Sequence, residues 1–91
     1  MTAKPEADRG QLVPEVMAQL RESGLRLTTP RKVIIQRVLE RREAFSAEEL
    51  LAEVRRIDAL ISLPTVYRTL SVLGRYGLVR RAETRDGRQV F

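Results

Sequence analysis

The side chains best suited to recognise a ligand lie on one short predicted helix, residues 62–76. At about 100° per residue, one side of this helix is apolar and carries Leu63, Val66, Leu70 and Leu73. The opposite side carries Pro64, Arg68, Ser71 and Arg75, with Thr65 and Tyr67 on the flanks. An arginine can donate two hydrogen bonds to guanine, a tyrosine can contact a thymine methyl or a phosphate, and hydroxyls bind phosphate oxygens. This face therefore predicts contact with DNA.

A simpler interpretation of the same face stays open at this point. The helix could be an amphipathic surface helix whose arginines do no more than keep the domain soluble. For Tyr67 this interpretation is as strong as the functional one, since a flanking tyrosine often packs its ring on the edge of the core and leaves only its hydroxyl in water.

A second group of arginines follows in a predicted β-hairpin. Strands are expected at residues 78–83 and 88–91, on either side of Asp86-Gly87, a dipeptide favoured in hairpin turns because it tolerates positive φ. The arginines of this segment are Arg80, Arg81, Arg85 and Arg88. Such side chains can reach phosphates or the minor groove beside a recognition helix.

Other kinds of chemistry find little support in the sequence. The chain has neither cysteine nor histidine, which excludes disulfides, thiolate or imidazole zinc sites and a Cys-His or Ser-His nucleophile. The carboxylates of Glu48, Glu49 and Glu53 are explained by helix capping and the helix dipole. We expect neither enzymatic activity nor specific metal binding by this chain.

Charge is distributed unevenly along the 91 residues, whose net charge is +5. Residues 1–61 are almost neutral, whereas residues 62–91 hold six arginines against Glu83 and Asp86. This basic third indicates a polyanionic partner, although frequent arginine in a GC-rich coding style is a competing explanation. Without a long apolar run we expect a cytoplasmic protein with no membrane partner and no small-molecule substrate.

The expected elements are four helices followed by the hairpin. Residues 1–10 are interpreted as a flexible tail, and residues 11–91 as one domain whose first helix runs from Gln11 to a glycine cap at Gly24. A second helix, capped by Thr29, reaches about Arg42 with an inner stripe at Ile34, Ile35, Val38 and Leu39; its arginines, including Arg37 and Arg41, should face solvent or a ligand. Capping patterns at Ser46 and Ser62 begin the third and fourth helices, and Gly77 ends the fourth.

Several spaced motifs together resemble the ferric uptake regulator family. They are Gly24-Leu25-Arg26-Leu27-Thr28, Pro30-Arg31, Ser46-Ala47-Glu48-Glu49-Leu50, Pro64-Thr65-Val66-Tyr67-Arg68-Thr69-Leu70, Gly77-Leu78-Val79 and Gly87-Arg88-Gln89-Val90-Phe91. The resemblance covers roughly residues 12–91, and Thr-Val-Tyr-Arg at the start of the fourth helix is its most specific part.

The resemblance implies a winged helix-turn-helix fold, mainly α with a small β-hairpin, in the DNA-binding domain of a metal-responsive bacterial repressor. It implies that Tyr67 and Arg68 meet bases in the major groove, that Arg26 reaches toward the minor groove, and that Arg31 and Thr65 hold the DNA backbone. Five further residues are predicted to touch the backbone or minor groove: Ser71, Arg75, Arg80, Arg81 and Arg88.

The implied partner is a double-stranded operator with inverted-repeat symmetry, bound by a homodimer. Full-length family members are expected to continue into a dimerisation domain with most ligands of a regulatory iron, zinc or manganese ion. Many members place a histidine shortly before the Ser-Ala-Glu cap, where this chain has Ala44 and Phe45. The alternative function is a winged-helix interaction module that binds an acidic protein through the same helical face.

Overall fold

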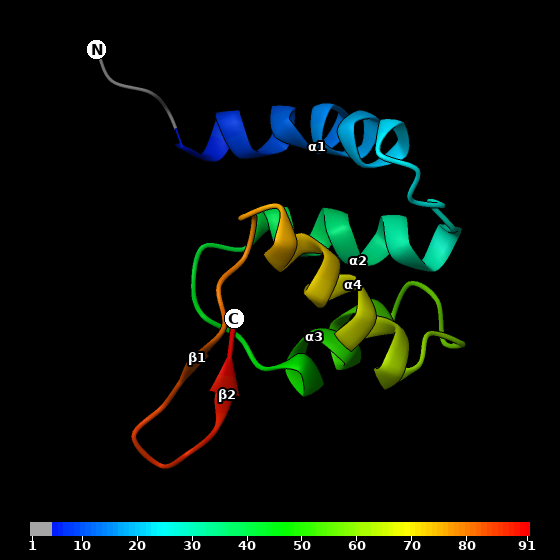
Figure 1. Ribbon diagram of the computed structural model, residues 1–91. Helices are drawn as coiled ribbons and strands as arrows, with labels where there is room; N and C mark the ends of the chain where they lie inside the picture. Colours follow the sequence, from blue (N-terminus) through cyan, green and yellow to red (C-terminus); the bar gives the residue numbers. More distant parts are fainter. Residues whose placement is uncertain (1–4) are drawn as a thin grey trace.

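The computed structural model describes residues 5–91, with side chains described from Val13 onward. In these residues four helices precede a two-stranded antiparallel hairpin, as Figure 1 shows. The elements are α1 (Pro5–Glu22), α2 (Thr29–Glu40), α3 (Ala47–Val54), α4 (Leu63–Arg75), β1 (Ala82–Glu83) and β2 (Gln89–Val90). Helix α1 lies along α2, and the hairpin projects from the helical body (Figure 1). The predicted mainly helical, winged-helix class is confirmed.

Helix α1 begins earlier than the sequence pattern predicted. It starts at Pro5 instead of Gln11, so the predicted tail over residues 1–10 is wrong for residues 5–10, while residues 1–4 lie outside the described part. Proline suits the beginning of a helix, where its missing N–H is not needed, and a single internal glycine such as Gly10 costs a helix only about 1 kcal/mol. The absence of apolar periodicity therefore did not prevent helix formation.

Helix α2 is capped one residue earlier than predicted. Thr28, with extended backbone angles, is the N-cap, and its hydroxyl accepts a 3.4 Å hydrogen bond from the Arg31 amide. The predicted cap, Thr29, is already helical. The helix ends at Glu40 because Arg41 adopts an extended conformation, two residues before the predicted end at Arg42.

The caps of α3 and α4 agree with the sequence interpretation. At α3, the Ser46 hydroxyl accepts from the Glu49 amide at 3.0 Å while the Glu49 carboxylate accepts from the Ser46 amide at 2.8 Å. At α4, Ser62 accepts from the Thr65 amide at 3.4 Å. Gly77 follows α4 with φ +73°, a left-handed conformation that glycine adopts without a steric penalty. Local hydrogen bonding thus defines both ends of α4.

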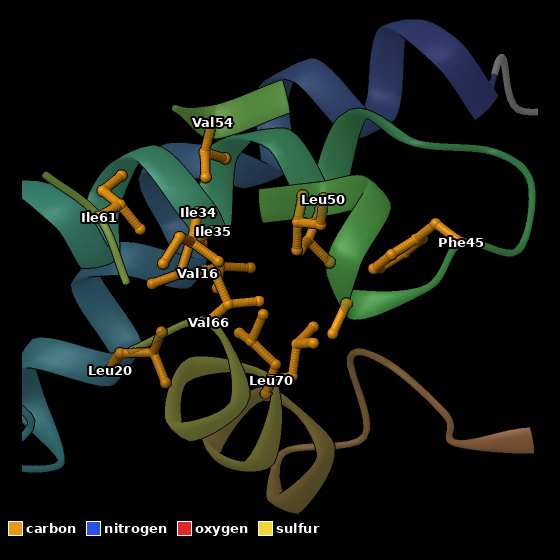
Figure 2. Packing of buried hydrophobic residues seen from close by; sticks show 13 residues of the cluster. Val16, Leu20, Ile34, Ile35, Phe45, Leu50, Val54, Ile61, Val66 and Leu70 are labelled. Atoms are coloured by element: carbon orange, nitrogen blue, oxygen red, sulfur yellow. The ribbon is translucent and has the colours of Figure 1, made fainter. Parts of the chain in front are cut away.

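The core unites the inner faces of all four helices. Figure 2 shows Val16 of α1, Ile34 of α2, Leu50 of α3 and Leu70 of α4 converging in one cluster. On α4 the predicted stripe holds, because Val66, Leu70 and Leu73 are buried and Leu63 is half-buried. In α2 the predicted inner residues Ile34, Ile35 and Val38 are buried, and Leu39 is partly buried against the core. Packing on this side fixes which face α4 turns outward.

The hairpin is shorter than predicted and has a different turn. Only Ala82–Val90 and Glu83–Gln89 pair as strands. At the beginning of the first predicted strand, the Leu78 amide instead donates to the Leu73 carbonyl at the end of α4. Gly87 has φ +87°, but no other residue type in the described chain has positive φ. Asp86-Gly87 is therefore not a two-residue turn.

Residues 84–88 join the strands, and three of them, Arg85, Asp86 and Gly87, lie between the hydrogen-bonded pair Thr84 and Arg88. The Thr84 amide donates to the Arg88 carbonyl at 2.8 Å and the Gly87 amide to the Thr84 carbonyl at 3.0 Å, a type I turn followed by a left-handed glycine. The Thr84 hydroxyl also donates to the Asp86 carboxylate, and this bond lowers the pKa of Asp86. The connection presents Arg85 and Arg88 at its exposed tip.

Candidate nucleic-acid interface

The outer face of α4 carries three side chains that have no hydrogen-bond or ion-pair partner among the described side chains. Arg68, Ser71 and Arg75 are exposed. Among residues 13–91, none of the three side chains takes part in a hydrogen bond or ion pair. Beneath them, the buried Thr69 hydroxyl donates to the Thr65 carbonyl at 2.8 Å, so its polar atom is satisfied within the helix. Arg68 therefore keeps its donors available to an external acceptor.

A hollow of about 340 Å³, which we call the α2–α4 hollow, brings together residues distant in sequence. Its lining is Arg26, Thr28, Pro30, Arg31, Thr65 and Arg68. Four of these six residues were predicted site residues: Arg26, Arg31, Thr65 and Arg68. Three guanidinium groups at one concave surface, beside the beginnings of two helices, provide a region of positive potential.

Two members of the α2–α4 hollow are held in place by internal hydrogen bonds. The Arg31 guanidinium donates from Nη1 to the Arg26 carbonyl oxygen at 2.7 Å. The Thr65 hydroxyl lies 3.0 Å from the Ser62 hydroxyl at the α4 cap. Arg31 thus ties the segment before α2 to α2 itself, while the exposed Arg26 side chain extends from that segment.

Tyr67 lies on a different side of α4 from the α2–α4 hollow. Its half-buried ring packs against the core edge. It shares a second hollow, of about 500 Å³, with Ser46 and Glu48 of the α3 start and Arg88 and Gln89 of the hairpin. Arg88 is exposed, and its Nε is 3.5 Å from the Asp86 carboxylate. Sequence reasoning had not placed Glu48 or Gln89 near Tyr67, because no local pattern links α3 to the hairpin.

A third hollow, of about 430 Å³, separates the end of α4 from the hairpin. It gathers the predicted residues Ser71, Arg75 and Arg81 around a floor that includes Val79 and Phe91. Arg80 is exposed but does not line any of these three hollows. Apart from Arg80, the predicted site residues therefore lie in three separate hollows around α4 instead of forming a single pocket.

Arg37 of α2 and Arg41 at its C-cap, which were expected to lie toward solvent or a ligand, are partly exposed and pair with Glu53 of α3. Arg41 Nη2 lies 2.8 Å from one Glu53 oxygen, and Arg37 Nη1 lies 3.5 Å from the other. Both side chains are partly buried, because these ion pairs link α2 to α3. Glu53, whose carboxylate was attributed to helix capping and the helix dipole, instead joins two helices. The partners are 12 residues or more apart in sequence, so no short-range pattern reveals them.

The carboxylates of α3 do not provide a metal site. In residues that the structure describes, no group of three or more potential acidic, cysteine or histidine ligands comes together. Glu49 is occupied by the capping box, where the hydrogen bond from the Ser46 amide lowers its pKa, and Glu53 is ion-paired. The described carboxylates of α3 therefore do not form a donor set that fits a divalent metal ion. The same part of the chain contains no helix of the length and hydropathy required to cross a bilayer.

Comparison with known proteins agrees with the family resemblance found in the sequence. Residues 22–91 match the model of the Ferric uptake regulator family. The chain belongs to the ferric uptake regulator family. The match includes every predicted DNA-contacting residue, from Arg26 to Arg88, as well as the three hollows around α4.

Relatives of this ferric uptake regulator chain include the ferric uptake regulation protein of Rhizobium leguminosarum bv. viciae, 37% identical over 70 residues. The match covers 77% of this chain and 49% of that protein. The protein of the same name from Synechococcus elongatus is 40% identical over 68 residues, covering 72% of this chain and 46% of its own length. The chain thus spans about half the length of these relatives.

Solved structures extend the likeness to three dimensions. A manganese uptake regulator superposes with a TM-score of 0.70 at 33% identity, covering 86% of this chain and 55% of its own. A zinc-bound manganese uptake regulator gives a TM-score of 0.65 at 30% identity over 96% of this chain and 59% of its own. The arrangement of helices and hairpin therefore resembles that of these two metal uptake regulators.

Proposed function

We propose that this chain binds double-stranded DNA sequence-specifically, as the DNA-binding domain of a metal-responsive, non-enzymatic transcriptional repressor. The supporting observation is the α2–α4 hollow, because Arg26, Arg31, Thr65 and Arg68 come from separate segments yet line one basic concavity. Membership of the ferric uptake regulator family supports the same conclusion.

In the proposed complex, α4 enters the major groove with its outer face toward the bases. Arg68 donates two hydrogen bonds to a guanine, and Tyr67 contacts a neighbouring base from the flank. Arg26 extends toward the adjacent minor groove, while Arg31 and Thr65 bind backbone oxygens. The remaining groups contact flanking phosphates: Ser71, Arg75, Arg80, Arg81 and Arg88.

We further propose that the full-length protein is a homodimer acting on an inverted-repeat operator under the control of iron, zinc or manganese. A two-fold dimer presents two copies of α4 to two half-sites. Because the described residues do not form a metal site, the regulatory ion would be held outside this domain. Alone, the domain should bind weakly and with steep salt dependence, since its contacts to phosphates release counterions.

The test begins with duplexes recovered by the protein from a random-sequence library. Fluorescence anisotropy then compares a recovered duplex with its shuffled version for the wild type, Arg68→Ala and Arg56→Ala. Arg56→Ala is a matched control, because it removes one exposed positive charge from a separate hollow formed with Arg37, Ala52 and Glu53. Arg68→Ala should cost about 1 to 3 kcal/mol on the recovered duplex and reduce discrimination, whereas Arg56→Ala should preserve discrimination.

Two outcomes would contradict the proposal. If the wild type binds no duplex near physiological salt, the basic surface serves another partner, such as an acidic protein. If Arg68→Ala weakens recovered and shuffled duplexes by the same factor, Arg68 does not read a base.

A further inference from the structure

One aromatic contact attaches the hairpin to the loop between α2 and α3. The Phe91 amide donates to the Phe45 carbonyl at 2.8 Å, and the Phe45 amide donates to the Phe91 carbonyl at 3.2 Å. This exchange is the hydrogen-bonded pair of an antiparallel ladder. The planes of the two rings are also tilted by 30° relative to each other, with centroids 6.0 Å apart. Phe45 is buried, so the contact fixes the last hairpin residue to the core.

An arginine lies over each of these two rings. Arg41 Cζ is 5.0 Å from the centroid of Phe45, and Arg81 Cζ is 5.7 Å from that of Phe91. Both distances are within the range of cation–π attraction. We call these four residues, Arg41, Phe45, Phe91 and Arg81, the arginine–phenylalanine stack. It runs from the end of α2 to the residue immediately before β1.

The two arginines of the stack differ in their surroundings. Arg41 is partly buried and ion-paired with Glu53, so it belongs to the structural framework. Arg81 is exposed, and within residues 13–91 its guanidinium has no hydrogen bond or ion pair. Arg81 also lines the third hollow beside Arg75 and Ser71 of α4. Its guanidinium is therefore held by a ring while its hydrogen-bond donors are available.

We propose that Phe91 is a positioning residue that orients Arg81 toward a DNA phosphate beside α4. The inference rests on the proposed DNA-binding function. A long side chain loses rotamer freedom when it binds, and a contact that restricts it beforehand reduces this loss. The ring can do so without consuming a donor, because cation–π attraction uses the guanidinium face. Arg80, the residue before Arg81, has no such ring contact in the described part of the chain.

The binding test is a double-mutant cycle with Arg81→Ala and Phe91→Leu, measured on a random-sequence duplex because the contact concerns phosphates. Phe91→Leu keeps an apolar side chain and removes the π face, and should weaken binding about two- to five-fold. Arg81→Ala should then have a smaller effect in the Phe91→Leu background than in the wild type. The matched control is Arg80→Ala, whose effect should be equal in both backgrounds. An equal effect of Arg81→Ala in both backgrounds would overturn the proposal.

A second measurement needs no DNA. In the wild type, nuclear Overhauser contacts should join the Arg81 side chain to the Phe91 ring, and ring currents should shift the Arg81 Hδ signals upfield. Phe91→Tyr should preserve this shift and the affinity, whereas Phe91→Leu should abolish the shift. Absence of the contacts in the wild type would overturn the proposal even if Phe91→Leu did not fold. If the contacts exist but no duplex binds, the DNA-binding function itself has failed.

Discussion

Replacing Ser46 by alanine should weaken the start of α3 and thereby the support of α4. The change removes the hydroxyl that accepts the Glu49 amide at 3.0 Å, while the reciprocal bond from the Ser46 amide to the Glu49 carboxylate at 2.8 Å can remain. Helix α3 has only eight residues, and helices this short are not stable by propensity alone. One of the two bonds that define its N-terminus is therefore lost.

The expected magnitude follows from this single lost bond. Removing an N-cap hydroxyl costs about 1 kcal/mol, within a range of about 0.5–2 kcal/mol. In a domain of this size, 1 kcal/mol corresponds to a melting temperature lower by about 4–8 °C. The Ser46 side chain is partly exposed, so water can replace part of the lost interaction, and a value near the middle of the range is expected.

Thermal and urea unfolding followed by circular dichroism measure this change. Ser71→Ala is the matched control, because it removes an exposed hydroxyl on α4 that has no hydrogen-bond partner among residues 13–91. Ser71→Ala should change the free energy of unfolding by less than about 0.5 kcal/mol. Equal stability of the two variants would refute the argument that the capping box stabilises α3.

Three other predictions concern the same framework. The hydrogen bond from the Ser46 amide lowers the pKa of Glu49 from its ordinary value of 4.5. Its contribution to folding stability is therefore present above pH 4.5 and is lost as the pH falls through the lower folded pKa. In urea titrations across this range, Glu49→Gln should lose less folding stability than the wild type. Leu70 is 2% exposed, and Leu70→Ala should lower the free energy of unfolding by about 2–5 kcal/mol, whereas a loss below 1 kcal/mol would mean that α4 is loosely packed. Gly87→Ala places a side chain at φ +87° and should cost about 1–2 kcal/mol by the same assay, with no loss expected if the turn can rearrange freely.

Local signals in the sequence predicted the beginnings of α3 and α4 and the end of α4, but not the start of α1 or the bounds of α2 and the strands. Ser46 and Ser62 cap their helices as expected, because capping depends on residues within one helical turn. Thr28 replaced Thr29 as a cap since two adjacent threonines offer equivalent hydroxyls, and only the backbone angles distinguish them. The early start of α1 was missed because apolar periodicity is a signal of packing and not of helix formation itself.

The candidate site was only partly accessible from sequence. Helical periodicity alone placed Arg68 outward, because residues four apart share a face. Nothing in residues 24–31 indicated that Arg26 and Arg31 would lie beside Arg68. Their DNA contacts were expected only because of the family resemblance. The contacts of Arg41 with Glu53 and of Phe45 with Phe91 join separate segments, so they required the folded chain.

The bond from the Arg31 guanidinium to the Arg26 carbonyl has a consequence for recognition. This bond restrains the segment before α2 in the free protein, so in the proposed complex DNA would not have to order it from many conformations. A lysine at residue 31 has no planar fork to serve the carbonyl and an external oxygen together. In the proposed complex, Arg31 would hold the Arg26 carbonyl and bind a phosphate at the same time, so the preorganisation of Arg26 would depend on the identity of a residue five positions away.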